Sequence, residues 1–440
     1  AAQSKEKADD EAIRVFTENL RQLLLSPPLG QKRVLAIDPG FRTGCKVVCL
    51  DAQGNLLHNE NIYPHPPVNK TGEAASKLRK MIEAYEIEAI SIGNGTASRE
   101  TEDFINHQTF DRQIPVFVVS EQGASIYSAS KIARDEFPDY DVTVRGAVSI
   151  GRRLMDPLAE LVKIDPKAIG VGQYQHDMNQ KKLGEALNGV VEDCVNKVGV
   201  DLNTASASLL EYISGISKAI AKNIVAYREE NGRFTDRREL LKVAKLGPKA
   251  FEQCAGFMRI QGGKNPLDAT SVHPESYEAV EKLFAKQGFT KEQYFGDGPT
   301  AIYIKDYKKL AEELGIGEIT LHDIIKELGR PGRDPREDMP KPILRSDVLD
   351  MKDLKEGMIL KGTVRNVIDF GAFVDIGVHQ DGLVHISQIS DKYIKHPLEA
   401  VSVGDVVDVK VVSVDLNKKR FGRSMRGIRK TKVIKSQKRV

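Results

Sequence analysis

Apolar side chains recur at helical spacing at the start of the chain. The spacing predicts a helix over residues 5–25. The proline- and glycine-containing stretch at residues 26–30 (SPPLG) ends this helix. Its apolar face is formed by Ile13, Phe16, Leu20, Leu23 and Leu24.

Short apolar runs replace the helical pattern after residue 31. Three runs separated by glycine-containing turns predict an antiparallel three-stranded start, and later strands alternate with helices. This order predicts a mixed α/β sheet covered by helices. The expected strands are 34–37, 45–50, 56–62, 89–92 and 116–119, and the expected helices are 74–85 and about 100–107.

The rest of the chain divides into a helical middle and a β-rich end. Residues 123–198 are mostly helical, and residues 200–260 are short helices broken by tight glycine turns. A Pro/Arg/Asp-rich stretch near residues 330–340 (RPGRDPREDMP) is typical of an exposed linker. After Met358, apolar and polar residues alternate over a stretch long enough for five short strands. This alternation predicts a small closed barrel. The predicted class is therefore a multidomain α+β protein.

The distribution of charged residues along the chain is more informative than the net charge. The 440 residues include 65 Lys+Arg and 62 Asp+Glu, a net charge of +3. Residues 417–440 hold eleven Lys/Arg and no acid, which leaves 54 basic and 62 acidic residues before them, a net of −8. A uniformly basic nucleic-acid coat protein and an acidic disordered tail protein are excluded. We expect an acidic body with a basic tail.

Cysteines and apolar stretches indicate the compartment. Cys45, Cys49, Cys194 and Cys254 form no CxxC pair and no Cys/His cluster of zinc spacing, which suits a reducing compartment. No apolar run approaches the roughly 18 residues that span a membrane, and the start lacks a signal peptide's apolar core. We expect a cytoplasmic protein without a membrane partner. The first helix has no N-cap, so we also expect a missing N-terminal region.

Aromatic residues in the predicted barrel suit single-stranded nucleic acid. Phe370 and Phe373 flank Gly371 and Ala372, which leaves the rings free to be exposed. Stacking of a base on such a ring contributes about 1–3 kcal/mol. The alternative is that the aromatic rings fill the barrel core.

The same segment closely resembles the RNA-binding OB fold named after ribosomal protein S-one, over about residues 357–425 (KGTVRNVIDFGAFVDIG, DGLVHISQIS, VGDVVDVKVVSVD). Lys361 and Arg365 could follow the phosphates. Arg423 stands where the family has an inward Leu, so the last strand could be frayed or used for phosphate contact. The resemblance places Phe370, Phe373, His385 and Arg420 on the binding face, with Asp415 at its edge.

Residues 202–259 resemble tandem helix-hairpin-helix repeats. Each family turn (apolar-x-Gly-apolar-Gly) exposes backbone amides that donate to a phosphate oxygen without reading a base. The first turn keeps Gly215 of its two glycines, and the second keeps Gly247. A helical scaffold or a protein-docking surface is the alternative. Phosphate contact is favoured by the nearby lysines Lys218, Lys222 and Lys249.

A carboxylate follows the first strand of the α/β region, at Asp38 before Pro39-Gly40. This arrangement, over about residues 30–155, resembles the YqgF and RuvC branch of the RNase H-like superfamily. The resemblance implies carboxylates that hold two Mg²⁺ or Mn²⁺ ions for phosphodiester hydrolysis. Neighbouring Arg152 and Arg153 favour a vestigial or binding role over a metal-dependent endonuclease. The other acids would be Glu121 after the strand at 116–119 and Asp156, with Asp165 as an alternative.

The order of these regions resembles the Tex family of bacterial transcription accessory proteins over essentially all 440 residues. The resemblance implies a non-catalytic, monomeric scaffold without a cofactor. It would bind single-stranded RNA and DNA mainly through the OB fold and the basic tail, in contact with RNA polymerase or a ribosome-linked complex. The expected domains are a helical lead-in (1–30), a YqgF/RNase H-like domain (31–155), a helical connector (156–200), tandem helix-hairpin-helix repeats (201–262), a helical connector and linker (263–345), the OB fold (346–425) and a basic tail (426–440).

Overall fold

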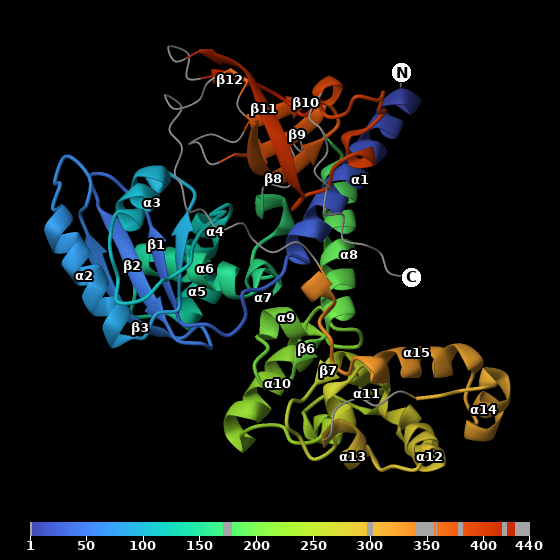
Figure 1. Ribbon diagram of the computed structural model, residues 1–440. Coiled ribbons are helices and arrows are strands. Elements are labelled where there is room, and N and C mark those ends of the chain that lie inside the picture. The colour runs from blue at the N-terminus through green and yellow to red at the C-terminus, as the bar shows by residue number, and fades with distance from the viewer. Residues whose placement is uncertain are drawn as a thin grey trace. The chain divides into compact units, whose positions relative to one another are not determined.

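The computed structural model divides into two compact units, Ala1–Val190 with Asp338–Val440, and Val191–Glu337. Figure 1 labels the helices and strands of both units. The side chains at positions 361, 414, 415, 420 and 421 are outside the description. The structure describes residues 2–169, 178–296, 302–338, 356–357, 359–376, 382–415 and 420–426.

The first unit contains the expected mixed sheet, in the order β3-β2-β1-β4-β5. The first three strands pair antiparallel, whereas β1, β4 and β5 run parallel. The three parallel strands therefore end at the same edge of the sheet. The strands are β1 (Val34–Asp38), β2 (Cys45–Leu50), β3 (Leu56–Ile62), β4 (Ala89–Gly93) and β5 (Val116–Val119).

Helices cover both faces of this sheet (Figure 1). Leu35 and Ile37 pack in a core with α2 and α3, and Val34 and Ala36 pack in a second core with α6. Gly151 lets α6 approach closely, since a Cβ there would lie 2.7 Å from Leu50 Cδ1. Both faces of β1 are therefore buried, which explains its unbroken apolar run. The helices of this unit are α1 (Ala2–Leu24), α2 (Thr71–Ala84), α3 (Ser98–Asn106), α4 (Ala124–Ala129), α5 (Lys131–Glu136), α6 (Val142–Met155), α7 (Pro157–Leu161) and the start of α8 (Gln180–Val198).

A five-stranded OB fold is the second sheet of this unit, in the order β10-β9-β8-β11-β12. Alternate residues of its strands, such as Val364, Ala372, Val374 and Val409, form the core. The core of the OB fold thus follows from a period-two pattern. The strands are β8 (Ile359–Ile368), β9 (Gly371–Asp375), β10 (Gly382–His385), β11 (Val406–Asp415) and β12 (Arg420–Ser424).

The second unit is built of short helices joined by glycine turns. A two-stranded parallel ladder links β6 (Val200–Asp201) to β7 (Met258–Arg259). Its later helices enclose an apolar core that includes Leu283, Phe284 and Leu321. The main helices are α9 (Ala207–Leu210), α10 (Lys218–Asn231), α11 (Pro248–Cys254), α12 (Tyr277–Gln287), α13 (Lys291–Gly296), α14 (Tyr307–Leu314) and α15 (Glu318–Gly329).

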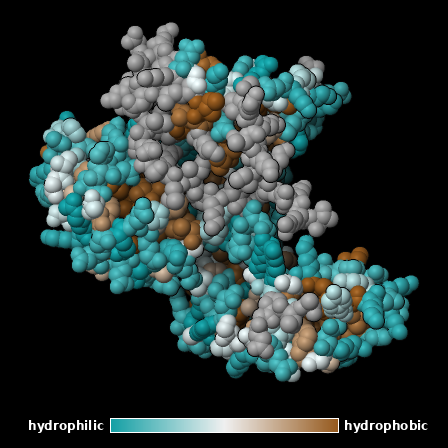
Figure 2. All heavy atoms as spheres, in the orientation of Figure 1, coloured by the Kyte–Doolittle hydropathy of each residue, from teal (hydrophilic) through white to brown (hydrophobic). Residues whose placement is uncertain are grey.

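Hydrophilic residues cover most of the visible described surface, with scattered hydrophobic patches (Figure 2). None of the helices in the described ranges is long and apolar enough to cross a membrane. Two tyrosines stand out from this surface, Tyr303 with 85% and Tyr393 with 90% of its area exposed.

Candidate nucleic-acid interface

Phe373 lies on the outer face of the barrel. Its neighbours Ala372 and Val374 are fully buried in the core, whereas Phe373 is half-buried and outside that core. In register, Phe373 pairs with Leu383 on β10 and Asn366 on β8. Alternation along β9 therefore directs this ring away from the core.

Phe370 and His385 lie beside the same end of β9. Gly371 pairs with His385, and the carbonyl of Phe370 accepts the Ile386 N–H at 2.7 Å. A Cβ at Gly371 would lie only 2.4 Å from the Val384 carbonyl oxygen, so glycine is required for this approach. Strand pairing thus brings Phe370, Phe373 and His385 together at one end of β9 and β10.

His385 is exposed and held in one orientation. Its Nδ1 accepts the Ser387 N–H at 3.2 Å, and the Ser387 hydroxyl lies 2.9 Å away. An imidazole that accepts at Nδ1 carries its proton on Nε2 when neutral. The ring therefore presents a donor that suits a phosphate or base oxygen.

The basic residues expected on the nucleic-acid face are not equally placed to contact a phosphate. Arg365 Nη1 lies 3.5 Å from Asp375 Oδ2, and both side chains are mostly buried, so its charge is paired within the barrel rather than free to follow a phosphate. Arg423 packs across Gly382 of β10, where a Cβ would lie 1.5 Å from its Cζ. The side chains of Lys361, Arg420 and Asp415 lie outside the described part of the chain, as do residues 427–440 of the expected basic tail.

The first helix-hairpin-helix turn replaces one family glycine with a serine. Gly215 adopts φ 81°, and Ser217 caps α10 by accepting the Ile220 N–H at 3.2 Å. Asn196 on α8 holds the turn, because its amide accepts the Ser214 N–H and donates to the Tyr212 carbonyl. One amide at the start of α10 is therefore occupied by the cap.

The second turn replaces the other glycine. Lys245 takes the left-handed position with φ 68°, and Gly247 precedes α11 without a side-chain cap. Asn223 on α10 donates to the Ala244 carbonyl at 2.9 Å, as Asn196 does for the first turn. Left-handed backbone at a non-glycine residue costs roughly 1–2 kcal/mol, so this turn is under strain. Lysines are exposed around both turns, namely Lys218, Lys222, Lys242, Lys245 and Lys249.

A third turn of this kind was missed in the region expected to be a helical connector. Gly315 ends α14 with φ 72°, and Gly317 caps α15, so the Gly-apolar-Gly core is complete. Glu318 follows directly and places a negative charge at the helix start. The signal that could have found it is the sequence Gly315-Ile316-Gly317 itself. The acid makes this turn less suited to phosphate than the other two.

The carboxylates of Asp38 and Glu121 meet at the end of the parallel strands. Register pairs Ile37 with Ile92 on β4, and Gly93 with Val119 on β5. Burial, with a smaller contribution from Glu121, raises the pKa of Asp38 from 3.8 to about 6. The two predicted acids are thus brought together by the sheet.

Glu121 sits in a space made by two glycines. A Cβ on Gly95 would lie 1.8 Å from Glu121 Oε1, and one on Gly93 would lie 2.5 Å from Oε2. Oε2 is buried without a hydrogen-bond partner among the described residues. Burial raises the pKa of Glu121, while the Gly95 N–H and Arg153 oppose the shift.

The structure does not bring Asp156 to this pair. Asp38 Oδ2 faces α6 near Gly146, at 3.9 Å from a Cβ there. Asp156 follows ten residues later, about 15 Å along a helix axis, and caps α7 through the Ala159 N–H at 3.1 Å. The alternative, Asp165, is exposed and accepts the Lys167 N–H at 3.0 Å. Both acids are used to cap turns.

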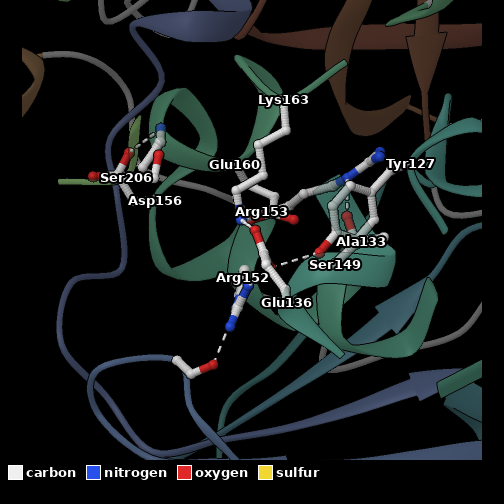
Figure 3. Close-up of polar contacts among 12 residues, drawn as sticks. Tyr127, Ala133, Glu136, Ser149, Arg152, Arg153, Asp156, Glu160, Lys163 and Ser206 are labelled. Carbon is white, nitrogen blue, oxygen red and sulfur yellow. Dashed lines mark hydrogen bonds and ion pairs between the residues drawn. The ribbon is translucent and has the colours of Figure 1, made fainter. Parts of the chain in front are cut away.

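Arg152 and Arg153 point to different partners. Arg152 Nη1 pairs with Glu136 Oε2 at 2.6 Å, and Lys163 Nζ lies 2.9 Å from Glu136 Oε1, as Figure 3 shows. Arg153 Nη1 donates to the Ser120 and Gln122 carbonyls at 3.0 and 2.6 Å, which holds it beside Glu121. Of these two arginines, Arg153 is the one that opposes the charge of Glu121.

A two-metal site does not fit these residues. Neither Asp156 nor Asp165 joins the pair as a third carboxylate, and Arg153 already supplies positive charge to Glu121. The described residues contain no group of three or more His, Cys, Asp or Glu arranged to hold a metal ion. Asp141, an acid that the sequence reasoning missed, begins α6 near Lys46, but it caps that helix through Thr143 and Val144.

Replacing Asp38 with Asn is expected to stabilise the protein at about pH 7.5 by about 1–2 kcal/mol. The folded-state pKa of Asp38 is raised from 3.8 to about 6, so folding favours the protonated form. The contribution of Asp38 to stability is therefore fully present below about pH 4 and is lost as pH rises through about 6. Thermal unfolding at about pH 4 and 7.5 measures the effect, with exposed Asp139→Asn as a control. Equal stability of Asp38→Asn and the unchanged protein at the higher pH would contradict it.

Four family models match the chain. They are the Tex protein YqgF-like domain (residues 32–155), the helix-hairpin-helix motif (195–259), the HHH domain (265–336) and the S1 RNA binding domain (353–426). The HHH domain covers much of the expected connector at 263–345 and contains the third turn.

Curated relatives match almost the whole chain. The uncharacterized protein YdcI of Bacillus subtilis is 57% identical over 424 residues, covering 96% of this chain and 59% of the relative. The transcriptional accessory protein Tex of Neisseria gonorrhoeae is 52% identical over 425 residues, covering 96% and 55%. Protein tex of Bordetella pertussis is 51% identical over 425 residues, covering 96% and 54%. The chain thus spans little more than half the length of these relatives.

Two solved structures illustrate matches to single regions of the chain. Thermus thermophilus RuvC in complex with a Holliday junction is 15% identical, with a TM-score of 0.22, and covers 27% of this chain and 90% of that one. GSP13 of Bacillus subtilis is 35% identical, with a TM-score of 0.17, and covers 19% and 68%. These scores are low, so the assignment rests on the family models and the curated relatives.

Proposed function

The chain belongs to the Tex family, and from this premise we propose that it is a transcription accessory scaffold that binds single-stranded RNA or DNA mainly through its C-terminal OB fold. The observation that carries the proposal is the grouping of Phe370, Phe373 and His385 at one end of β9 and β10. Two aromatic faces accept unpaired bases, and the imidazole offers a donor to the backbone.

The helix-hairpin-helix turns add contacts to phosphates. Exposed lysines surround both turns, and no side chain caps the start of α11. Such contacts position a strand without reading its bases. The scaffold therefore binds with little sequence preference, and the OB fold supplies the preference for single strands.

Catalysis is not part of the proposal. The YqgF-like domain keeps two acids at the strand ends, but Arg153 lies beside Glu121 and Asp156 caps α7. The Asp38–Glu121 pair is better suited to a structural or binding role than to hydrolysis of a phosphodiester. Cleavage of branched or single-stranded substrates by the purified chain with Mg²⁺ or Mn²⁺, lost in Asp38→Asn, would overturn this part.

A salt titration tests the function. Each phosphate that the protein neutralises releases a counterion. For single strands, this makes the slope of the logarithm of the binding constant against the logarithm of the salt concentration more negative by about 0.7. With three phosphate contacts the slope is about −2, so affinity falls about 20-fold between about 50 and 200 mM salt. Fluorescence anisotropy with single- and double-stranded RNA and DNA of equal length measures it. A preference for duplexes, or binding independent of salt, would contradict the proposal.

A further inference from the structure

Tyr393 lies on the loop between β10 and β11 and is the most exposed large apolar residue among those described, with 90% of its area open. Single exposed apolar side chains are common on protein surfaces, so exposure alone does not mark a site. The use of this ring is therefore inferred from the loop that carries it and from the charges beside it.

Two contacts link the loop that carries Tyr393 to the barrel. His396 is buried, and its Nε2 lies 3.2 Å from Asp369 Oδ1, while its Nδ1 accepts the Leu398 N–H. Asp391 Oδ1 lies 3.9 Å from Arg426 Nε at the other end. The ring is thus presented on a defined backbone. A tyrosine fixed in this way loses little conformational entropy on binding, because only two side-chain torsions remain free.

The anchors of the loop place it beside the candidate interface. Asp369 is adjacent to Phe370 in the chain, and Phe370 accepts the Ile386 N–H directly after His385. The loop therefore continues from the end of β9 and β10 where the aromatic residues gather. Tyr393 extends the same region of the barrel.

Charge around the ring suits a polyanion. Lys392 and Lys395 flank Tyr393 and are exposed. The nearby acids are engaged, since Asp391 pairs with Arg426 and Glu399 Oε2 accepts the Lys395 N–H at 3.1 Å. An aromatic face between two lysines is the combination that stacks a base and contacts the phosphates on either side of it.

We propose that Tyr393, with Lys392 and Lys395, forms a further stacking platform that takes one more unpaired nucleotide beyond those on Phe370 and Phe373. The inference rests on the proposed single-strand binding and names the part of the ligand that this loop holds. A protein partner on the same ring is the competing use, and the experiment distinguishes it.

The absence of tryptophan makes a direct test possible. The 440 residues contain no Trp, so Tyr393→Trp introduces a single indole reporter. A base stacked on the indole quenches its fluorescence. We expect strong quenching at a saturating concentration of single-stranded oligonucleotide, and none in the matched control Tyr303→Trp, which is 85% exposed in the other unit.

A length series adds a second measurement. Tyr393→Ala should weaken binding of a long oligonucleotide about fivefold or more. With oligonucleotides of increasing length, the affinity of this variant should reach its plateau at a length one nucleotide shorter than the affinity of the unchanged chain does. Tyr393→Phe should retain the affinity. If oligonucleotides bind but Tyr393→Trp is not quenched and Tyr393→Ala binds normally, the ring serves another contact and the inference is wrong. If the unchanged chain binds none of the oligonucleotides, the proposed function itself fails.

Discussion

Replacing Phe370 and Phe373 together with alanine is expected to weaken binding of single-stranded RNA or DNA at least about 30-fold. Each base stacked on an aromatic ring contributes about 1–3 kcal/mol, so two lost stacks cost at least about 2 kcal/mol. Both rings lie outside the barrel core, and the strand that carries them keeps its buried residues Ala372 and Val374. Anisotropy titrations of the full chain at one salt concentration measure the loss.

The tyrosine pair Phe370→Tyr and Phe373→Tyr is the matched control. It keeps both aromatic faces, so its affinity should remain within about threefold, because stacking tolerates changes at the ring edge. The alanine pair should also keep the salt slope of the unchanged chain, since it removes no phosphate contact. An unchanged dissociation constant in the alanine pair would assign the rings to packing instead.

Replacing Arg237 with Met is expected to destabilise the unit formed by Val191–Glu337 by at least about 4 kcal/mol. Arg237 is 0% exposed. Its guanidinium donates to the carbonyls of Met258, Leu267, Val272 and Thr270 and to the Tyr277 hydroxyl.

The physical reason is the number of buried acceptors that one side chain satisfies. Each acceptor left without a donor costs about 1–3 kcal/mol, so even partial relaxation leaves a large loss. Lysine has only three donors on a single ammonium nitrogen, so Arg237→Lys should recover little. Urea unfolding followed by circular dichroism measures the change.

Arg238 provides the comparison at the next position. Its side chain is exposed, so Arg238→Met should change stability by no more than about 0.5 kcal/mol. Similar unfolding curves for the Arg237 and Arg238 variants would show that the buried hydrogen bonds contribute little to the fold.

Much of the fold could be predicted from local pattern. The expected strands at 34–37, 45–50 and 56–62 correspond to β1, β2 and β3, because a run of apolar residues between turn residues has few other stable conformations. The alternation after residue 358 likewise predicted a barrel. The Gly315-Ile316-Gly317 turn was missed, because the helices around it were interpreted as a connector.

The candidate sites were predicted less completely. Asp38 and Glu121 meet because Asp38 ends β1 and Glu121 comes shortly after β5, two parallel strands that end at one edge. Asp156 was expected with them, but α6 carries the chain away before it reaches that residue. Arg365 was expected on the nucleic-acid face, yet it lies at an irregularity in the β8–β9 pairing, where its guanidinium forms an ion pair with Asp375.

The sequence by itself determined the elements, their order and the family, because these follow from periods of two or 3.6 residues and from short turn motifs. Only the tertiary structure decided which charged groups are paired, as with Arg365 and Arg153, and which rings remain open, as with Tyr393. Such pairings join residues distant in the chain, and they depend on strand register and helix length, which no local pattern encodes.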